Sequence, residues 1–503
     1  MSRLATGVLA ACLGAGCAKA MPALPGEPPA PKSSPSGVVK SLQHDLRRIF
    51  GAPMMSRAVW AVGVKSLDTG ETLYSLNANK LVMPASNMKI VTLAAAAEVL
   101  GWDYRFNTSL ETTGTVQNGV LAGDLFLRST GDPTINTRQK RGDAVLAEWV
   151  GALKAAGIRR IEGRMVGDDD AFDEEGLGDG WSWDYLQYGY AAPVGALQFN
   201  ENTARLTVTP GLKPGDPASA TITAGSGFTI VSKTTTGAEK SDEAIEYRRH
   251  PYQPILEVAG SVPVGGTAAT RNVAVLNPTI YFAQALRDAL TSGGIEVTGE
   301  AVDIDDIALE FTESPPTRRV LATTQSPPLR EMATVLMKVS QNLYAETLLK
   351  ALGTAGGGVG TTGTGRAAAR TAFDGWGLAR DSYQITDGSG LSRSNYVSTE
   401  MVMALLERMH RDERHRDAFV ATLPIAGKDG TISTRMRRTL AEGNAVAKTG
   451  SIANVRSLSG YVRTRDGEVL AFSIIANDFT IPAATVTWIA DLAVEVLAGF
   501  TRK

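Results

Sequence analysis

The sequence predicts an α+β protein: helices packed on an antiparallel sheet, with a β-rich insert interrupting this unit. Three observations predict it. Helical patterns occur near both ends of the chain, and short apolar runs typical of strands accompany them. Between residues 106 and 312 the sequence pattern changes to short strands, turn residues and Asp/Gly clusters. Two helical regions around a β-rich block indicate one domain split by an insert of one or two subdomains.

The elements of the outer unit follow from local patterns. Leu42, Leu46 and Ile49 have helical spacing, and the apolar runs 58–65 and 71–76 are joined at a turn sequence, which predicts a hairpin. The remaining expected helices are 87–100, 329–352, 399–411 and 483–498, and the remaining expected strands are 445–448, 458–462 and 469–476. Within the insert, only 279–290 has a clear helical pattern.

Composition excludes several functional classes. The 503 residues include 50 Lys+Arg and 52 Asp+Glu, a net charge of −2 without a basic stripe, so no nucleic-acid partner is expected. Both cysteines, Cys12 and Cys17, lie in the first twenty residues, which excludes a disulfide scaffold and a cysteine-ligated zinc site. The four histidines form no HExxH motif. A zinc hydrolase is therefore not expected.

The N-terminus predicts export. Residues 1–20 combine Arg3, a short apolar run and small residues, as in a signal peptide, and the Pro/Ser-rich segment 21–39 predicts a tether. Ala18-Lys19-Ala20 fits a cleavage site, whereas Cys12 or Cys17 fits a lipoprotein box that would anchor the protein to a membrane. A disordered cytosolic tail is the alternative. We expect a location in the periplasm or cell envelope.

One serine and one lysine are the first chemical candidates. Ser86 and Lys89 lie at the start of the helix expected at 87–100, and residues three apart share a helix face. A serine hydroxyl needs an adjacent base to become a nucleophile, and a lysine provides one only when burial or positive neighbours lower its pKa. The alternative is that Ser86 caps the helix and Lys89 is a solvated first-turn lysine.

Two further motifs follow in the chain. Ser340-Gln341-Asn342 falls inside the expected helix, where serine and asparagine are mediocre helix formers, so a polar role at a cleft is indicated. Lys448-Thr449-Gly450 would end the strand expected at 445–448, with Ser451 next, and the glycine would allow a substrate backbone to approach closely. Each motif alone could be a surface loop, and the argument depends on their combination and order.

In this order the three motifs resemble those of the penicilloyl-serine transferases. Further stretches are similar to the class C D-alanyl-D-alanine carboxypeptidase/endopeptidase family of penicillin-binding protein 4. These stretches are Pro84-Ala85-Ser86-Asn87-Met88-Lys89, Gly131-Asp132-Pro133-Thr134, Ser340 to Glu346, Asp387-Gly388-Ser389-Gly390-Leu391-Ser392, Leu423-Pro424-Ile425-Ala426-Gly427 and Gly430-Thr431. The resemblance implies a serine β-lactamase/transpeptidase-like domain in two segments, 40–105 and 316–503, split by the insert 106–315.

The resemblance also implies roles for site residues. Ser86 would be the acylated nucleophile, Lys89 the general base, and Ser340 a proton relay to the leaving amine. Asn342 would bind the peptide carbonyl, while Lys448, Thr449 and Ser451 would bind the terminal carboxylate, next to Gly450. The backbone N–H groups of Ser86 and Ser451 would form an oxyanion hole.

The implied function is an exported serine-type D-Ala-D-Ala carboxypeptidase, and a DD-endopeptidase as well, that acts on peptidoglycan stem peptides. The resemblance also implies covalent acylation by β-lactams such as penicillin, and a mechanism with no metal and no cofactor. Two alternatives remain: a β-lactamase or esterase on the same scaffold, and a non-catalytic peptidoglycan-binding scaffold protein. A lipid anchor and a homodimer are both compatible with the sequence.

Three weaker patterns receive structural explanations. The Gly-rich match at 358–363 follows a helix and not a strand, so we expect a loop and no dinucleotide site. The acidic residues of 168–175 lack the glycine and closing glutamate of a calcium loop, so we expect a solvated turn. The aromatic residues of 181–190 could stack on glycan, but we expect them to pack the core of the insert.

Overall fold

The computed structural model describes residues 36–250, 252–307 and 317–503. The expected signal peptide, with Cys12 and Cys17, and nearly all of the expected tether lie outside the described residues. The end of that tether is helical, because α1 (Gly37–Phe50) begins inside it, capped by the Ser36 side chain. Among the described residues, none of the helices has both the length and the apolar character of a membrane span.

A five-stranded sheet forms the centre of the outer unit, in the order β2-β1-β22-β21-β20, with every neighbouring pair antiparallel. The expected hairpin is its first pair. The strands are β1 (Val59–Ser66), β2 (Thr72–Leu76), β20 (Val446–Ile452), β21 (Val455–Arg463) and β22 (Val469–Asn477). The sheet therefore unites residues near both ends of the chain, which places the insert in a connection between its strands.

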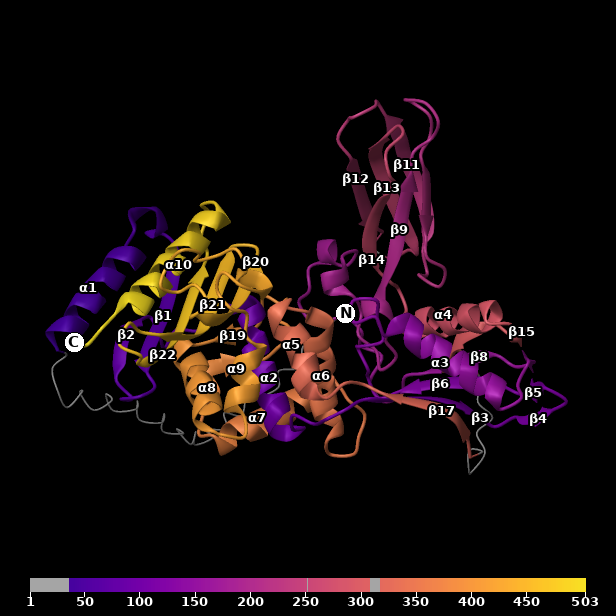
Figure 1. Cartoon of the computed structure of the whole chain (residues 1–503), viewed down its shortest axis with the longest axis horizontal. Coiled ribbons are helices and arrows are strands. Elements are labelled where there is room, and N and C mark those ends of the chain that lie inside the picture. Colours follow the sequence, from indigo (N-terminus) through magenta and orange to yellow (C-terminus); the bar gives the residue numbers. More distant parts are fainter. Residues whose placement is uncertain (1–35, 251, 308–316) are drawn as a thin grey trace, which may run out of the picture.

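Helices cover both faces of this sheet (Figure 1). In the central strand β22, Leu470, Phe472 and Ile474 join the cluster on the side of α1 and α10, whereas Ala471 and Ile475 join the cluster on the opposite side. Alternate strand residues face opposite sides, so burial on both sides explains the nearly continuous apolar run of this strand. The helices are α10 (Ala483–Gly499) with α1 on one side, and α2 (Met88–Val99), α5 (Leu329–Lys338), α6 (Asn342–Thr354), α7 (Thr362–Gly375), α8 (Thr399–Arg411) and α9 (Arg416–Thr422) on the other.

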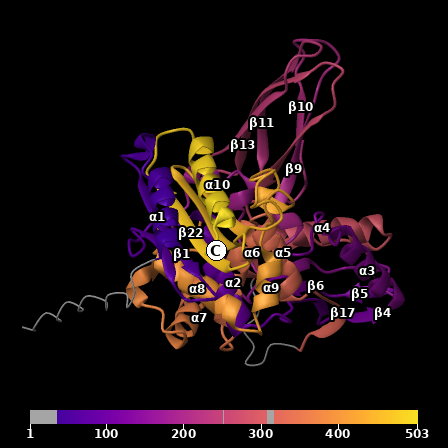
Figure 2. The same cartoon turned by 60° about the vertical axis from the view of Figure 1, so that its left-hand side comes forward.

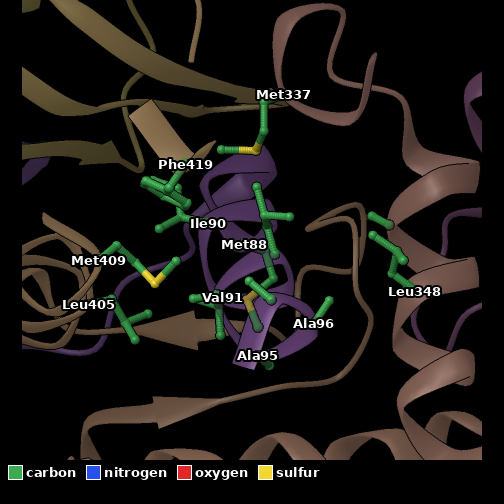
Figure 3. Close-up of a cluster of buried hydrophobic side chains, with 14 of the residues drawn as sticks. Met88, Ile90, Val91, Ala95, Ala96, Met337, Leu348, Leu405, Met409 and Phe419 are labelled. Carbon is green, nitrogen blue, oxygen red and sulfur yellow. The ribbon is translucent and has the colours of Figure 1, made fainter. Parts of the chain in front are cut away.

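Helix α2 is buried along almost its whole length (Figure 3). Met88, Ile90 and Val91 are buried in the cluster that surrounds it, and the four consecutive alanines at 94–97 are buried as well. A helix that is apolar all round belongs in a core. Phe419 of α9 and other side chains from α5, α6 and α8 pack against it. The N-terminus of α2, where Ser86 lies, is therefore held by rigid packing.

The insert has a lower part, in which two sheets and two helices share one core. Its helices are α3 (Gly142–Ala155) and the expected α4 (Pro278–Ser292), and Trp149 of α3 stacks on Phe282 of α4. The strands are β3 (Asn107–Thr112), β4 (Thr115–Gln117), β5 (Val120–Ala122), β6 (Leu125–Ser129), β7 (Arg160–Ile161), β8 (Met165–Asp168), β15 (Glu296–Val297), β16 (Ala301–Asp303) and β17 (Arg319–Gln325). Helix α3 was not expected; it contains Gly142 and Gly151 and has no side-chain N-cap, although its apolar spacing is helical.

The upper part of the insert consists of two three-stranded sheets that project away from the rest (Figures 1 and 2). Their strands share a small separate core. They are β9 (Thr203–Thr209), β10 (Ser219–Ile222), β11 (Thr229–Gly237), β12 (Ala244–Arg249), β13 (Ile255–Pro263) and β14 (Ala269–Ala274). A further pair, β18 (Tyr383–Gln384) and β19 (Tyr396–Val397), belongs to the outer unit.

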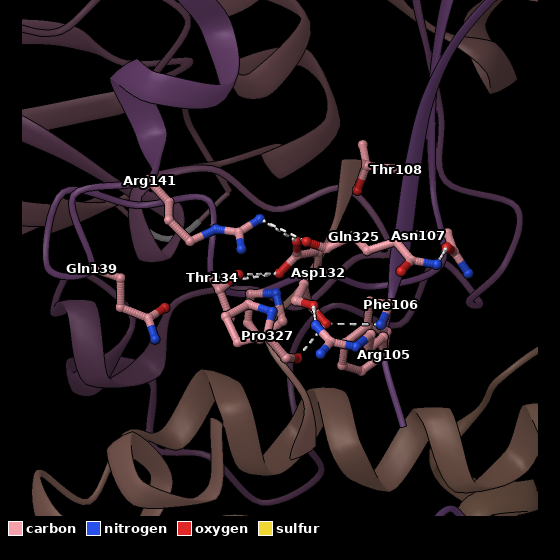
Figure 4. A network of polar contacts seen from close by, with 12 residues as sticks. Arg105, Phe106, Asn107, Thr108, Asp132, Thr134, Gln139, Arg141, Gln325 and Pro327 are labelled. Carbon is pink, nitrogen blue, oxygen red and sulfur yellow. Dashed lines mark hydrogen bonds and ion pairs between the residues drawn. The ribbon is translucent and has the colours of Figure 1, made fainter. Parts of the chain in front are cut away.

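The chain enters and leaves the insert side by side. Strand β17 pairs with β3, so the sheet of the insert closes after the expected boundary at 315. Beside this pair, buried Asp132 accepts hydrogen bonds from the Thr134 N–H and hydroxyl, at 2.8 and 2.6 Å, and Arg141 lies 3.5 Å away (Figure 4). Arg105 donates to the Ser326 carbonyl at 2.7 Å. The last contact joins the segment that enters the insert to the segment that leaves it.

Candidate active site

Ser86 lies in a 3₁₀ turn (Ala85–Asn87) directly before α2. Its neighbour Ala85 has a positive φ of 46°, and Asn87, not Ser86, occupies the N-cap of α2. The alternative in which Ser86 only caps the helix is therefore wrong. The turn places the hydroxyl beside the positive end of the helix dipole, which favours developing negative charge.

Lys89 is fully buried, and its amine contacts Ser86. The Lys89 Nζ–Ser86 Oγ distance is 3.0 Å, and Nζ also lies 2.8 Å from the Ser389 carbonyl oxygen. Burial lowers the pKa of Lys89 to about 7, although Glu346 and Asp387 raise it. The alternative of a solvated lysine is wrong. Near neutral pH a large share of this amine is unprotonated and can accept a proton from the serine.

The second motif is not inside a helix, which corrects the sequence-based expectation. Helix α5 ends at Lys338, α6 begins at Asn342, and Ser340 between them has a φ of 62°. The Gln341 side chain caps α6 by accepting from the Leu343 N–H at 3.2 Å. The helical break turns Ser340 and Asn342 toward the cleft, which a continuous helix would not do.

Lys448 is the second fully buried amine, on β20. The motif lies in the middle of the strand and not at its end, since β20 continues to Ile452. Lys448 Nζ lies 2.8 Å from Ser340 Oγ. Burial, and next the nearby charge of Lys89, lower its pKa well below the usual value. The charge of Lys89 therefore disfavours the protonated form of Lys448.

Asn342 connects Lys89, the candidate base, to the insert. Its Oδ1 lies 2.6 Å from Lys89 Nζ, and its Nδ2 donates to the Tyr190 carbonyl at 2.7 Å. Tyr190 belongs to the insert, in the 3₁₀ turn Gly189–Ala191. Both ends of one amide are thus fixed, one by the catalytic lysine candidate and one by the insert.

A buried loop supports the carbonyl that contacts Lys89. Glu346 accepts from the backbone N–H groups of Gly388 and Ser389 at 2.9 and 2.7 Å. Asp387 accepts from several groups of the same loop and from Trp181 Nε1 of the insert at 2.9 Å. Burial and neighbouring Asp387 raise the pKa of Glu346. Sequence reasoning assigned no chemical role to Glu346 or Asp387 and expected Trp181 in the core of the insert, because only the tertiary fold brings these residues together near Lys89.

Strand β20 passes close to Ser86 at Gly450. A Cβ on Gly450 would lie 2.9 Å from the Ser86 nitrogen, so only glycine permits this approach. Thr449 Oγ1 bonds Thr431 Oγ1 at 2.7 Å, and Ser451 is exposed. Thr449, Gly450 and Ser451 also line a pocket of about 340 Å³, whose lining includes Val486 and Ala490 of α10. Contacts join Lys89 to Ser86 and Asn342, join Lys448 to Ser340, and bring Gly450 against Ser86. These six residues therefore meet between α2, the α5–α6 break and β20, in the region that we call the cleft.

The aromatic residues of 181–190 do not form the core of the insert, so the expectation of core packing is wrong. Trp183 is 61% exposed and Tyr190 44% exposed. With Tyr185, Tyr188 and Tyr247 they line a pocket of about 710 Å³ between this segment and the strands β12, β13 and β14 of the upper part. Exposed aromatic faces are those that the stacking alternative requires.

Two groups among the described residues have the spacing of metal ligands, and neither lies in the cleft. The first group consists of Glu98, Asp412 and His415. Arg414 pairs with Glu98 and Asp412, and Trp102 donates to His415 Nδ1 at 3.1 Å. These internal contacts already satisfy that group. The second group lies in the insert and consists of Asp169, Asp303 and Asp305.

Comparison with known families agrees with this geometry. The sequence model of the D-Ala-D-Ala carboxypeptidase 3 (S13) family matches residues 42–495. The chain belongs to this family. S13 enzymes are hydrolases, so the expectation of a D-Ala-D-Ala carboxypeptidase-type hydrolase is confirmed at the level of the family.

Individual relatives cover most of this S13 member. A D-alanyl-D-alanine carboxypeptidase of Actinomadura sp. (strain R39) is 34% identical over 91% of this chain and 85% of its own length. The D-alanyl-D-alanine carboxypeptidase DacB of Haemophilus influenzae is 28% identical over 83% of this chain and 85% of its own. The crystal structure of penicillin binding protein 4 (dacB) from Haemophilus influenzae matches with a TM-score of 0.77 and 25% identity, covering 91% of this chain and 99% of that one. The expected α+β, transpeptidase-like fold is confirmed.

Proposed function

We propose that this S13 enzyme cleaves the terminal D-Ala-D-Ala bond of peptidoglycan stem peptides through an acyl-enzyme on Ser86. One observation carries the proposal: the fully buried Lys89 amine lies 3.0 Å from the Ser86 hydroxyl and has a pKa lowered to about 7. This pair supplies the nucleophile and the base that acyl transfer requires.

In the proposed acylation, Ser86 Oγ attacks the carbonyl carbon of the penultimate D-Ala while Lys89 Nζ takes the hydroxyl proton. The C–N bond then breaks, and the proton held by Lys89 passes to the leaving amine of the terminal D-Ala through Ser340 Oγ, which lies 2.8 Å from Lys448 Nζ, so Lys89 is neutral again. In the second half-reaction water attacks the ester carbonyl and gives a proton to Lys89. The ester C–O bond then breaks, and Lys89 returns this proton to Ser86 Oγ, which restores the free serine.

Binding groups surround the reacting bond in this scheme. The backbone N–H groups of Ser86 and Ser451 hold the oxyanion; the close approach of β20 to Ser86 at Gly450 supports their convergence. Loss of one such donor typically lowers the rate about 10²- to 10³-fold. Asn342 holds the peptide carbonyl, and Lys448, Thr449 and Ser451 attract the terminal carboxylate.

The same centre would open D-Ala-to-diaminopimelate cross-links, which makes endopeptidase activity part of the proposal. It would also be acylated by β-lactams, whose strained amide mimics the scissile bond; the Haemophilus penicillin binding protein 4 fold is known in a complex with a β-lactam. A long-lived penicillin adduct would support the peptidase, whereas rapid penicillin turnover would favour the β-lactamase alternative.

The proposed substrate requires a location outside the cytoplasm. We infer export through the signal-like residues 1–20, with lipid attachment at Cys12 or Cys17 as one form of anchoring. Mass spectrometry of the mature N-terminus distinguishes cleavage after Ala20 from a lipidated cysteine. The homodimer remains a prediction that sedimentation of the purified protein tests.

Substitution of Ser86 tests the mechanism. Release of D-Ala from a stem pentapeptide should fall about 10⁴-fold or more in Ser86→Ala, because no nucleophile remains. Labelling with a fluorescent penicillin, followed by peptide mapping, should place the adduct on Ser86 in the wild type and show none in the variant.

Ser75→Ala is the matched control, since Ser75 is an exposed serine on β2, outside the cleft. It should retain activity and labelling. D-Ala release that survives in Ser86→Ala would refute the acyl-enzyme, and labelling without any peptide hydrolysis would favour the scaffold alternative.

A further inference from the structure

The acidic segment of the insert is not the solvated turn that its sequence suggests. Asp168 and Asp169 are buried, with relative exposures of 3% and 6%. Asp168 has ion-pair partners in Arg318 and Arg128. Asp169 has none among the described residues, and its Oδ1 is buried without any hydrogen-bond partner. Such an oxygen is costly to bury unless something neutralises it.

Further carboxylates converge on Asp169. One carboxylate oxygen from each of Asp169, Asp303 and Asp305 lies within 4.8 Å of the others. Asp303 is 4% exposed, and Asp169, Glu174 and Asp303 line a cavity of about 210 Å³. Asp169 and Glu174 lie in the segment that follows β8, Asp303 is the last residue of β16, and Asp305 lies in the 3₁₀ turn that follows (Ile304–Asp306).

The charge of this group is not balanced by basic side chains. In the described part of the chain, no lysine, arginine or histidine pairs with Asp169, Glu174, Asp303 or Asp305. The hydrogen bonds that exist there come from neutral groups: Thr279 donates to Asp169, and Asn277 Nδ2 donates to Asp303 at 2.8 Å. Burial, and next the surrounding carboxylates, raise the pKa of Asp169 to about 6.

We propose that Asp169, Glu174, Asp303 and Asp305 bind a divalent cation, calcium in preference to magnesium. Two oxygens that each lie about 2.4 Å from one calcium ion are at most about 4.8 Å apart, as this group is. Carboxylate oxygens are the ligands that hard cations select. The irregular segments that carry them suit the flexible coordination of calcium better than the strict octahedron of magnesium.

The ion would hold the base of the segment that reaches the active site. Lys350 of α6 bonds the Asp173 side chain and, at 2.9 Å, the Glu175 carbonyl, so the segment is already attached to the outer unit. Bound calcium would attach the same segment to the α4 and β16 side of the insert. Farther along, this segment supplies the Tyr190 carbonyl that fixes Asn342.

Calorimetric titration of the full chain, freed of metal with EDTA, tests the proposal. Calcium chloride at about pH 7.5 should bind at one site with a Kd between about 10⁻⁵ and 10⁻³ M and raise the Tm, and magnesium should bind at least tenfold more weakly. Asp169→Asn should lose saturable binding. Absence of saturable calcium binding to the wild type up to about 10 mM would overturn the site.

Adjacent glutamates provide a matched pair if Asp169→Asn does not fold. Glu174 and Glu175 are both exposed, but only Glu174 lines the cavity. Glu174→Gln should weaken calcium binding about tenfold, and Glu175→Gln about twofold or less. Equal weakening by both substitutions would indicate diffuse surface charge and overturn the site. Equal affinity for magnesium would overturn the preference for calcium.

Discussion

The cleft and the acidic cavity of the insert both bury charges of one sign, and they differ in how the charge can be removed. The cleft holds Lys89 and Lys448, both fully buried. The cavity holds Asp169 and Asp303, each more than nine-tenths buried. Burial disfavours the charged form in both places, and like-charged neighbours add to it.

This difference in the sign of the buried charge determines which chemistry each region can support. An amine that loses its proton becomes a base that accepts a proton from Ser86. A carboxylate that gains a proton becomes neutral and loses its attraction for cations, whereas one that binds a metal keeps its negative charge. In the two proposals, the cleft therefore would use its shifted pKa values in proton transfer, and the cavity would offer its charge to an ion.

The largest predicted effect comes from replacing Lys89 with a side chain of similar volume that has no amine. Lys89→Met should lower the rate constant of acylation by penicillin about 10³- to 10⁴-fold, because a general base contributes up to about 10⁴. Stopped-flow fluorescence measures it. The variant should keep the native near-UV circular dichroism, since methionine fills a similar space. Acylation at the wild-type rate would show that Lys89 is not the base.

The next effect is a dependence on pH. Since the pKa of Lys89 is lowered to about 7, the neutral fraction rises with pH, and the acylation rate constant should fall about tenfold for each pH unit below 7. The same shift makes the unfolded chain bind more protons between about pH 7 and 10.5, so the contribution of Lys89 to the free energy of unfolding rises with pH there.

Acylation by a neutral β-lactam between pH 5.5 and 8.5 checks this dependence, since such a substrate does not titrate in that range. Circular dichroism over the same range controls for unfolding. A flat profile, or one that falls as pH rises, would contradict the neutral amine.

The smallest effect concerns the segment that joins the two regions. Trp181→Phe removes the bond to Asp387 and should lower the free energy of unfolding by about 1 to 2 kcal/mol and the acylation rate a few-fold. Trp183→Phe is the matched control, because Trp183 is 61% exposed and has no bond to the Asp387 loop. Urea unfolding and stopped-flow acylation measure both. Equal effects of the two substitutions would mean that the segment does not support the cleft.

Local patterns in the sequence were sufficient to predict the hairpin of β1 and β2, helices such as α8 and α10, and the three motifs. They were insufficient where a residue breaks its local rule. Ser340 at a φ of 62° divides a region whose apolar spacing indicates one helix, and the two halves, α5 and α6, share a core with α2. Local helix propensity predicts the ends of a helix poorly when tertiary contacts oppose it.

The rest of the site depends on contacts between residues far apart in the sequence. The Ser389 carbonyl reaches Lys89 from 300 positions away, and Asp303 meets Asp169 only because β16 pairs with β8. Periodicity describes one element at a time and contains no information on such encounters. For this reason the acidic residues of the insert suggested a solvated turn, and the aromatic ones a core.

The amide of Asn342 is held by an oxygen that comes from outside the catalytic fold. Without the Tyr190 carbonyl, rotation by about 180° about the last side-chain bond would exchange Oδ1 and Nδ2 at little steric cost. An NH₂ group would then point at Lys89 in place of an acceptor, and the carbonyl-binding donor would face away from a bound peptide. The insert thus supplies one of the two contacts that select the orientation of this amide, and without it Lys89 alone would have to hold Oδ1 in place.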